Sequence, residues 1–132
     1  MSARPLGPNE SLVLAVLSRA ARPLGAYQIL DETRAHGMRA PQQVYRALER
    51  LVAGDLVHRI ESLNAYQPCR HGPQRHHAAF AICKRCGSAA EFPHQAILPE
   101  LEQAAGALAF AVDSVRIELS GTCSGCKTAT GM

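Results

Sequence analysis

The alternation of apolar and polar positions in the first half of the chain predicts three helices. In the first, which Asn9 or Ser11 would cap, four apolar side chains recur at helical spacing: Leu12, Val13, Val16 and Leu17. A second helix is expected from Ala26 to His36, where a short apolar stripe opposes a polar side and Gly37 ends the helix. Pro41 suits the first turn of a third helix, because a proline there loses no intrahelical hydrogen bond.

The third predicted helix separates its apolar and polar residues most clearly. Its apolar stripe consists of Val44, Leu48, Leu51 and Val52, and its outward side carries Gln42, Gln43, Tyr45, Arg46, Glu49 and Arg50. Gly54 is expected to follow in the left-handed region. A strand over residues 56–61, a turn over 62–64 and a returning strand over 65–67 come next. Three helices followed by a hairpin are the layout of a winged helix-turn-helix domain, which we assign to residues 1–67.

A change of composition separates this half from the rest. Pro68, Gly72 and Pro73 cluster among polar residues, which is typical of a hinge, and we place the hinge at residues 68–76. Beyond it we expect strands over 78–83 and 88–92, a helix that begins near His94 or at Pro99 and ends near Leu108, and a strand around 114–119. The predicted fold class is therefore α+β, with a small α/β domain over residues 77–132.

The size and composition of the chain exclude several classes of protein. A chain of 132 residues and 14.2 kDa has room for one ordinary domain or two very small ones, which excludes a large multidomain enzyme. Hydrophobic residues make up 47% and charged residues 19%, as in a soluble folded protein. The net charge of +3 is too small to argue for nucleic acid by itself. The apolar run over residues 12–17 is too short for a signal peptide or a membrane span, so we expect a cytosolic protein.

Two close pairs of cysteines form the strongest chemical signal. Cys83 and Cys86 form one C-x₂-C pair, and Cys123 and Cys126 form another. This spacing lets two thiolates converge on one ion from a tight turn, and two such turns complete a tetrahedral site, so we expect structural zinc. A redox dithiol is the rival interpretation, but no thioredoxin-like βαβ pattern surrounds either pair. Because aromatic residues are only 5% and Trp is absent, so short a chain would gain from a metal staple.

A second group of ligand types lies around the hinge. Cys69 has four histidines in its neighbourhood, His58, His71, His76 and His77, and Glu91 follows the first cysteine pair. Thiolate, imidazole and carboxylate together favour zinc over iron or magnesium. Each residue taken singly has an ordinary explanation, so the residues alone leave a second metal site open. An enzyme in which Cys69 is a nucleophile beside a histidine base is disfavoured, because no oxyanion-hole turn or Gly-rich phosphate cradle accompanies it.

Four stretches of the chain resemble the ferric uptake regulator family. They are residues 40–48, residues 54–66, the segment 80–87 that holds the first cysteine pair, and the segment 117–126 that holds the second. The resemblance extends from about Leu12 to Cys126. Within the family the chain looks most like the zinc uptake regulators, because four residues match the sensory zinc site of that branch: His58, Cys69, His76 and Glu91.

The resemblance implies a homodimeric, zinc-dependent transcriptional repressor of zinc-acquisition genes rather than an enzyme. Residues 1–67 would bind operator DNA and residues 77–132 would form the dimerisation domain. Two zincs per chain are implied. The permanent one would be held by Cys83, Cys86, Cys123 and Cys126, and the regulatory one by His58, Cys69, His76 and Glu91, with His71 or His77 as alternatives to His76. An ion held by both domains and the hinge would set their relative orientation, and so the spacing of the two DNA-reading heads.

The resemblance also implies a set of DNA contacts. Tyr45 would pack against a thymine methyl group or bond a phosphate, and Arg46 is suited to guanine. Gln43 stands where the family often has Ser or Thr, and it can reach a base edge or a phosphate. Arg39, Arg50 and Arg59 are expected at phosphates. The alternative is that Arg46 and Arg50 are merely solvated and pair with Glu49.

The segment before the first cysteine pair departs from the iron-sensing relatives. Ala78, Ala79 and Phe80 stand where those proteins are rich in His and Asp, which argues against an iron or peroxide sensor and against a third metal site. A sensor of another metal, iron or manganese, and a constitutive DNA-binding module that zinc only stabilises are the remaining alternatives.

Overall fold

The computed structural model describes residues 5–69 and 77–129, and its chain divides into two compact units, Met1–Pro73 and Gln74–Met132. His71 and His76, which belong to the expected hinge, lie outside the described residues. In the part of the chain that is described, no helix has the length and apolar character needed to cross a membrane.

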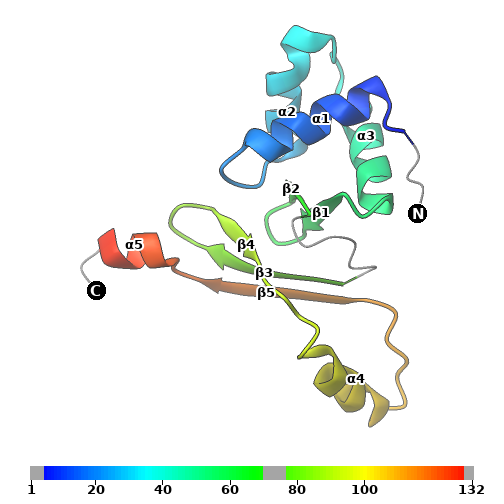
Figure 1. Cartoon of the computed structure of the whole chain (residues 1–132), viewed down its shortest axis with the longest axis vertical. Helices are drawn as coiled ribbons and strands as arrows, with labels where there is room; N and C mark the ends of the chain where they lie inside the picture. The colour runs from blue at the N-terminus through cyan, green and yellow to red at the C-terminus, as the bar shows by residue number, and fades with distance from the viewer. Residues whose placement is uncertain (1–4, 70–76, 130–132) are drawn as a thin grey trace. The chain divides into compact units, whose positions relative to one another are not determined.

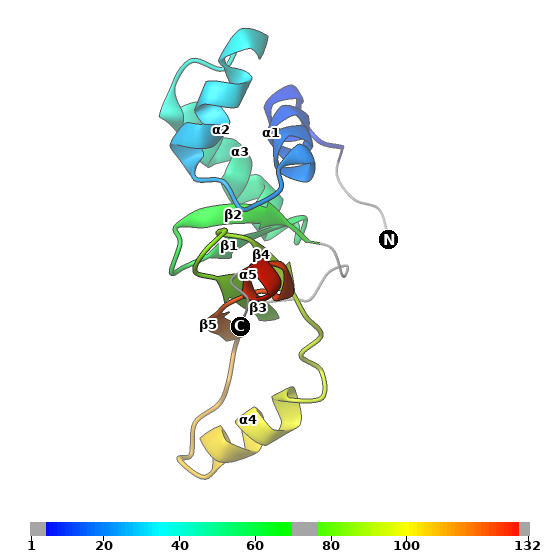
Figure 2. The same cartoon turned by 90° about the vertical axis from the view of Figure 1, so that its left-hand side faces the viewer.

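The first unit contains three helices and a hairpin, in the order that the sequence pattern predicts. The helices are α1 (Pro8–Arg19), α2 (Ala26–Thr33), which continues into the 3₁₀ turn η1 (Arg34–His36), and α3 (Pro41–Ala53). Strands β1 (Val57–Ile60) and β2 (Ala65–Pro68) pair antiparallel, with His58 opposite Gln67. Within this unit the three helices pack together on one side of the hairpin (Figure 1 and Figure 2). The loop before α2 joins the hairpin through two backbone hydrogen bonds between Leu24 and Tyr66.

All three helices of this unit begin in the same way, which differs from the expectation for α1. Their N-caps are Gly7, Gly25 and Ala40, none of which has a side-chain oxygen. In each helix the third residue reaches back instead, and its side-chain oxygen accepts the N–H of the N-cap: Glu10 at 3.3 Å, Gln28 at 2.8 Å and Gln43 at 3.1 Å. The prediction that Asn9 or Ser11 caps α1 is wrong, because both residues lie inside the helix.

The end of α3 also corrects a prediction. Gly54 has φ −88° and is not in the left-handed region; Asp55 takes that conformation, with φ 61°. The N–H of Asp55 donates to Val52 O and that of Leu56 to Leu51 O, both at 3.0 Å, which is the hydrogen-bond pattern of a Schellman motif shifted one residue from the glycine. The motif turns the chain sharply from α3 into β1.

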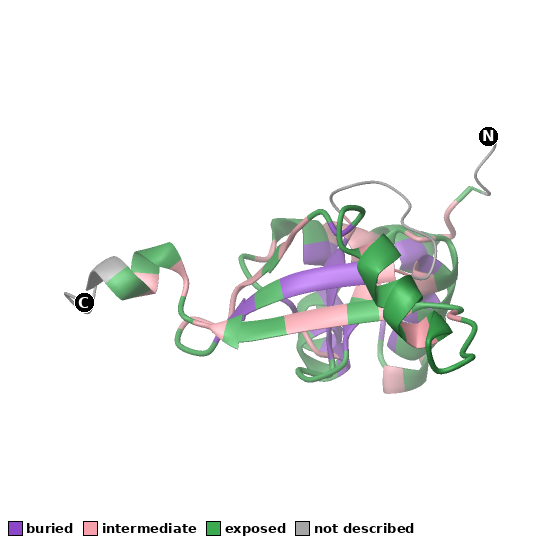
Figure 3. Ribbon diagram, turned by 90° about the horizontal axis from the view of Figure 1, so that it is seen from below, coloured by how far each residue is buried: buried purple, intermediate pink, exposed green. Residues whose placement is uncertain are grey.

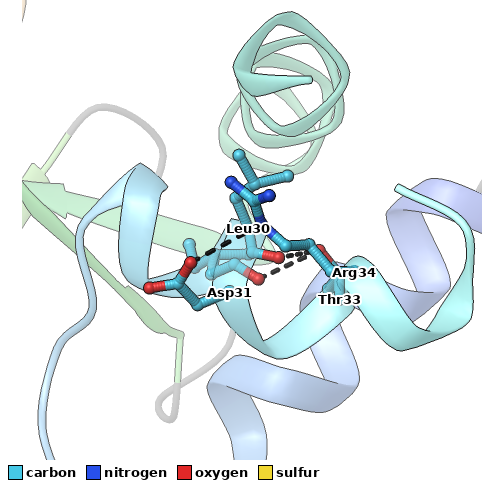
Figure 4. A network of polar contacts seen from close by, with 5 residues as sticks. Leu30, Asp31, Thr33 and Arg34 are labelled. Atoms are coloured by element: carbon cyan, nitrogen blue, oxygen red, sulfur yellow. Dashed lines mark hydrogen bonds and ion pairs between the residues drawn. The ribbon is translucent and has the colours of Figure 1, made fainter. Parts of the chain in front are cut away.

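The core of the first unit forms where the apolar stripes of the helices meet. Its most buried members are Val13, Leu17, Ile29, Leu30, Met38, Val44, Leu48, Leu51 and Val57. Leu12 and Val52, expected on these stripes, are only partly buried, and Ala47 is buried instead. Figure 4 shows the end of α2, where the hydroxyl of the buried Thr33 donates to the carbonyls of Ile29 and Leu30 at 3.0 and 3.2 Å. The buried hydroxyl of Thr33 is therefore satisfied by carbonyl groups of its own helix.

The second unit is a three-stranded sheet with two helices. Its central strand β3 (His77–Cys83) pairs antiparallel with β4 (Ala89–Glu91) and parallel with β5 (Val115–Gly121). β3 is mostly buried, whereas β5 is half-buried or exposed (Figure 3). Helix α4 (Leu98–Gly106) has Pro99 in its first turn, so the later of the two expected helix starts is correct. Helix α5 (Ser124–Ala129) is not predicted by the sequence pattern; it grows out of the second cysteine turn, where Lys127 N donates to Cys123 O.

Candidate metal centre and nucleic-acid interface

The second unit brings four cysteine sulfurs together. Cys83 ends β3 and Cys86 lies in the turn that leads to β4, while Cys123 and Cys126 lie at the junction of β5 and α5. The parallel register places Cys83 opposite Gly121, so both cysteine turns fall at the same end of the sheet. The four sulfurs all lie within 4.8 Å of one another.

Hydrogen bonds to two of the four sulfurs favour the thiolate form, which is the form that binds a cation. Cys83 Sγ accepts the backbone N–H groups of Arg85 and Cys86 at 3.4 and 3.5 Å, and Cys86 Sγ lies 3.1 Å from the Ser88 hydroxyl. Backbone hydrogen bonds from Cys86 and Cys123 lower the pKa of Cys83 to about 6, and the Ser88 hydroxyl lowers the pKa of Cys86. A hydrogen bond with the Cys123 side chain raises the pKa of Cys126 to about 12. The four sulfurs therefore do not all ionise unaided, and a bound divalent cation would displace the remaining protons.

The spacing of the sulfurs matches zinc. The edge of a tetrahedron with Zn–S bonds of 2.3 Å is about 3.8 Å long. Cys86 Sγ and Cys123 Sγ, which come from the two different turns, are 3.8 Å apart. The donor set, four thiolates with no oxygen ligand, is the one typical of structural zinc.

Two side chains of the types that can bind a metal lie at the open end of the hairpin in the first unit. His58 is on β1, and Cys69 follows β2, where its N–H donates to Leu56 O at 2.9 Å and extends the strand pairing. Cys69 is two residues beyond Gln67, the partner of His58, and so lies on the same face of the hairpin. Ligand atoms of His58 and Cys69 lie within 4.8 Å of each other. A short cross-strand pair of this kind offers two of the four ligands that a zinc ion needs.

Glu91 and His77, also considered for the regulatory site, are in the second unit. Glu91 ends β4, half-buried and paired in register with Phe80. His77 begins β3, and its Nδ1 accepts the N–H of Val115 at 3.1 Å. The centroids of the His77 and His94 rings are 5.7 Å apart in a T-shaped arrangement. A neutral imidazole that binds metal through Nε2 carries its proton on Nδ1, which then cannot accept a hydrogen bond. The observed hydrogen bond therefore disfavours His77 as a ligand.

The outward face of α3 carries the residues expected to read DNA. Tyr45 and Arg46 are both exposed, and Arg46 has no ion-pair or hydrogen-bond partner among the described side chains. Arg39 is exposed just before the helix. Gln43 is engaged locally: its Oε1 accepts the N–H groups of Arg39 and Ala40 at 2.7 and 3.1 Å, so it caps α3.

The two remaining arginines expected at phosphates are held by neighbouring side chains. Arg50 Nη1 lies 3.2 Å from Glu10 Oε2 of α1, so its partner is not Glu49, as the alternative interpretation supposed. Arg59, on β1, donates to Asn64 Oδ1 at 3.0 Å and lies 3.8 Å from a Glu61 carboxylate oxygen. Such exposed pairs are weak, so they leave Arg59 available to other partners.

The contacts of three residues near these sites could not be identified from the sequence. Glu10 pairs with Arg50 across 40 positions of chain, Ser88 bonds a cysteine sulfur, and His94 is buried in the turn before α4, where its carbonyl accepts two N–H groups. The only sequence signal for Glu10 is its place three residues after Gly7, where a Glu can complete a helix cap. No signal pointed to the other two.

Comparison with known proteins connects these features. Residues 16–120 match the model of the ferric uptake regulator family. The zinc uptake regulation protein of Escherichia coli (strain K12) is 34% identical over 123 residues, which cover 92% of this chain and 72% of that protein. The crystal structure of holo XcZur is 37% identical with a TM-score of 0.86 and covers 96% of this chain and 89% of its own. A zinc uptake regulator complexed with zinc and DNA is 31% identical with a TM-score of 0.88, over 97% and 87% of the two chains.

These similar proteins are regulators, not enzymes. The expectation that the chain has no catalytic function is thereby confirmed. The likeness to zinc uptake regulators, which the sequence motifs indicated, is confirmed as well.

Proposed function

The chain belongs to the ferric uptake regulator family, and we propose that it is a zinc-responsive repressor, a homodimer that binds operator DNA when zinc occupies a regulatory site and so controls zinc-uptake genes. The observation that carries this proposal is the His58–Cys69 pair, which belongs to the first unit, whereas the four-cysteine cluster belongs to the second. One site built wholly inside the second unit suits a permanent ion. A pair of ligands on the first unit, incomplete by itself, suits an ion that comes and goes.

The permanent site consists of Cys83, Cys86, Cys123 and Cys126. Its four protein ligands leave no open position for a substrate, so its zinc would contribute folding energy rather than chemistry. The 3.8 Å sulfur–sulfur distance and the hydrogen bonds to two of the sulfurs support this role.

The regulatory site consists of His58, Cys69, His76 and Glu91, which gives two zincs per chain. Two imidazoles, a thiolate and a carboxylate form a donor set that suits zinc better than iron or magnesium. The hydrogen bond from Val115 to His77 Nδ1 favours His76 over its neighbour. His58 and Cys69 belong to the first unit and Glu91 to the second. Residues of both units that share one ion would restrict the relative orientation of the units and select the shape that fits DNA.

The DNA interface in this proposal is the exposed face of α3, with the hairpin as the wing of a winged helix-turn-helix domain. Tyr45 and Arg46 would enter the major groove, with Arg46 suited to the O6 and N7 atoms of guanine. Arg39 before α3 and Arg59 on β1 would contact phosphates. Gln43, whose oxygen caps α3, would contribute through its amide group alone.

The dimer interface in this proposal is an apolar surface of the second unit. Large apolar side chains are exposed in the turn before α4, on α4, in the segment after it and on β5: Ile97, Leu101, Leu108, Phe110 and Leu119. Leu108 is 80% exposed and Phe110 64%. So many exposed apolar side chains on a unit of this size indicate a protein–protein interface, and a second copy of the chain is the partner that this family membership favours.

Operator binding measured against buffered free zinc tests the proposal. The full chain should bind an operator fragment steeply more tightly as free zinc rises, and Cys69→Ala should remove this response while the protein stays folded and retains one zinc. Metal analysis should find two zincs per chain, one of which mild chelation removes. A flat response to zinc would indicate a constitutive DNA-binding module, and a steeper response to iron or manganese would indicate a different sensor; either result overturns the proposal.

A further inference from the structure

Glu10 is a buried carboxylate at the start of α1 that is paired with an exposed arginine of α3. Its side chain is only 5% exposed, whereas that of Arg50 is 63% exposed. Both carboxylate oxygens are engaged: Oε2 accepts from Arg50 Nη1 at 3.2 Å, and Oε1 accepts from Gly7 N at 3.3 Å. Burial makes an isolated carboxylate charge costly, and the guanidinium of Arg50 is a positive partner that offsets this cost.

The pair lies beside the arginine that is expected to read bases. Arg46 precedes Arg50 by one helical turn, and both line a groove between α1 and α3 together with Glu10. The charge of Arg50 is compensated by Glu10, whereas Arg46 has no ion-pair partner in the described part of the chain. Of the two guanidinium groups on this edge of α3, that of Arg50 is therefore paired with a carboxylate and that of Arg46, over the ranges that the structure describes, is not.

We propose that Glu10 is a specificity-determining residue of the DNA interface, which withholds Arg50 from the phosphates and leaves Arg46 as the free arginine on this edge of α3. The inference rests on the proposed function, in which α3 binds DNA. It replaces the expectation that Arg50 contacts a phosphate. Phosphate contacts strengthen binding to every sequence alike, whereas base contacts discriminate between sequences. In a chain whose net charge is only +3, one additional free arginine would increase the sequence-independent part of DNA binding relative to the part that depends on base contacts.

The test compares salt series for two duplexes: an operator selected in vitro from a random library, and a scrambled duplex of the same length. Glu10→Gln keeps the size of the side chain and an acceptor for the Gly7 N–H, but removes the charge. In zinc-loaded protein, the slope of log K against log[salt] should steepen by about 0.9, as for one more phosphate contact. Affinity for the scrambled duplex should then rise about fivefold at 0.15 M salt, and the operator-to-scrambled ratio should fall.

Two further variants separate this inference from other effects. Glu49→Gln removes an exposed carboxylate from the same helix, so it changes the net charge equally but frees no arginine; its slope should change less. The double variant Glu10→Gln/Arg50→Gln removes both charges together and should return the slope and the ratio to those of the parent chain. Melting curves show which variants are folded, and the double variant, which has no buried charge left to satisfy, decides the question if Glu10→Gln alone is unstable.

The outcomes distinguish this inference from the proposed function. If the double variant loses about 0.9 of slope and binds both duplexes more weakly, Arg50 contacts a phosphate in the parent chain and the inference is wrong. An unchanged slope in a folded Glu10→Gln variant overturns it too. A parent chain that enriches no duplex from the random library at any zinc level overturns the proposed function itself.

Discussion

Removal of the zinc from the four-cysteine site should unfold the second unit and spare the first. The structure gives the reason in its distribution of apolar residues. Of the twenty buried hydrophobic residues among the described ones, fifteen belong to the first unit and five to the second. Of those five, only Phe80 and Ile82 are large side chains.

The magnitudes favour this outcome. Burial of Phe80 and Ile82 contributes about 1.5–3 kcal/mol each, or about 3–6 kcal/mol together, and the small side chains of β3 add little. A structural zinc contributes about 10–16 kcal/mol in small zinc domains at neutral pH. The metal therefore contributes more to the stability of the second unit than its large apolar side chains do. The first unit has its own core and no share in the cysteine cluster.

Hydrogen exchange resolved by peptide is the appropriate assay. After exhaustive chelation under reducing conditions, amides of β3 and β5 should lose their protection, while those of α1 and α3 keep it. Cys126→Ser should behave like the chelated protein, and Cys69→Ala, which removes a thiol outside the cluster, should not. Protection of β3 that persists in protein shown by metal analysis to be free of zinc would refute the reasoning.

Four other predictions concern single residues. His58→Ala should leave the melting temperature near that of the parent while operator binding no longer responds to zinc; global loss of circular dichroism would count against a regulatory role. Arg46→Ala should cost about 1–3 kcal/mol of operator binding, with little change on scrambled DNA, and an equal loss on both duplexes would contradict base recognition. Gly37 has φ 105° and open space around it, so Gly37→Ala should destabilise the protein by about 1–2 kcal/mol in urea unfolding through backbone strain, and an unchanged midpoint would refute this. Phe110→Glu should yield monomers in sedimentation experiments, whereas a dimer that persists would place the interface elsewhere.

The local elements of this protein follow from short-range pattern. The stripe of Val44, Leu48 and Leu51 indicates α3, and the run after residue 55 indicates the hairpin, because helix and strand periods are properties of neighbouring residues. Where two local signals compete, the pattern fails. Gly54 is the expected left-handed residue, yet Asp55 adopts that conformation, and Ser11 is a good cap that lies inside α1.

The two cysteine pairs were likewise evident from spacing, because two thiols three residues apart already share a turn. The tertiary structure alone decided that both turns meet at one end of the sheet, through the parallel register of β3 and β5. It also decided the partner of Arg50. A sequence shows which charges exist, but Glu10 and Arg50 are 40 residues apart, and only the packing of α1 against α3 brings them within 3.2 Å. Periodicity and spacing determine elements and ligand types, whereas pairings between distant residues depend on how the elements pack.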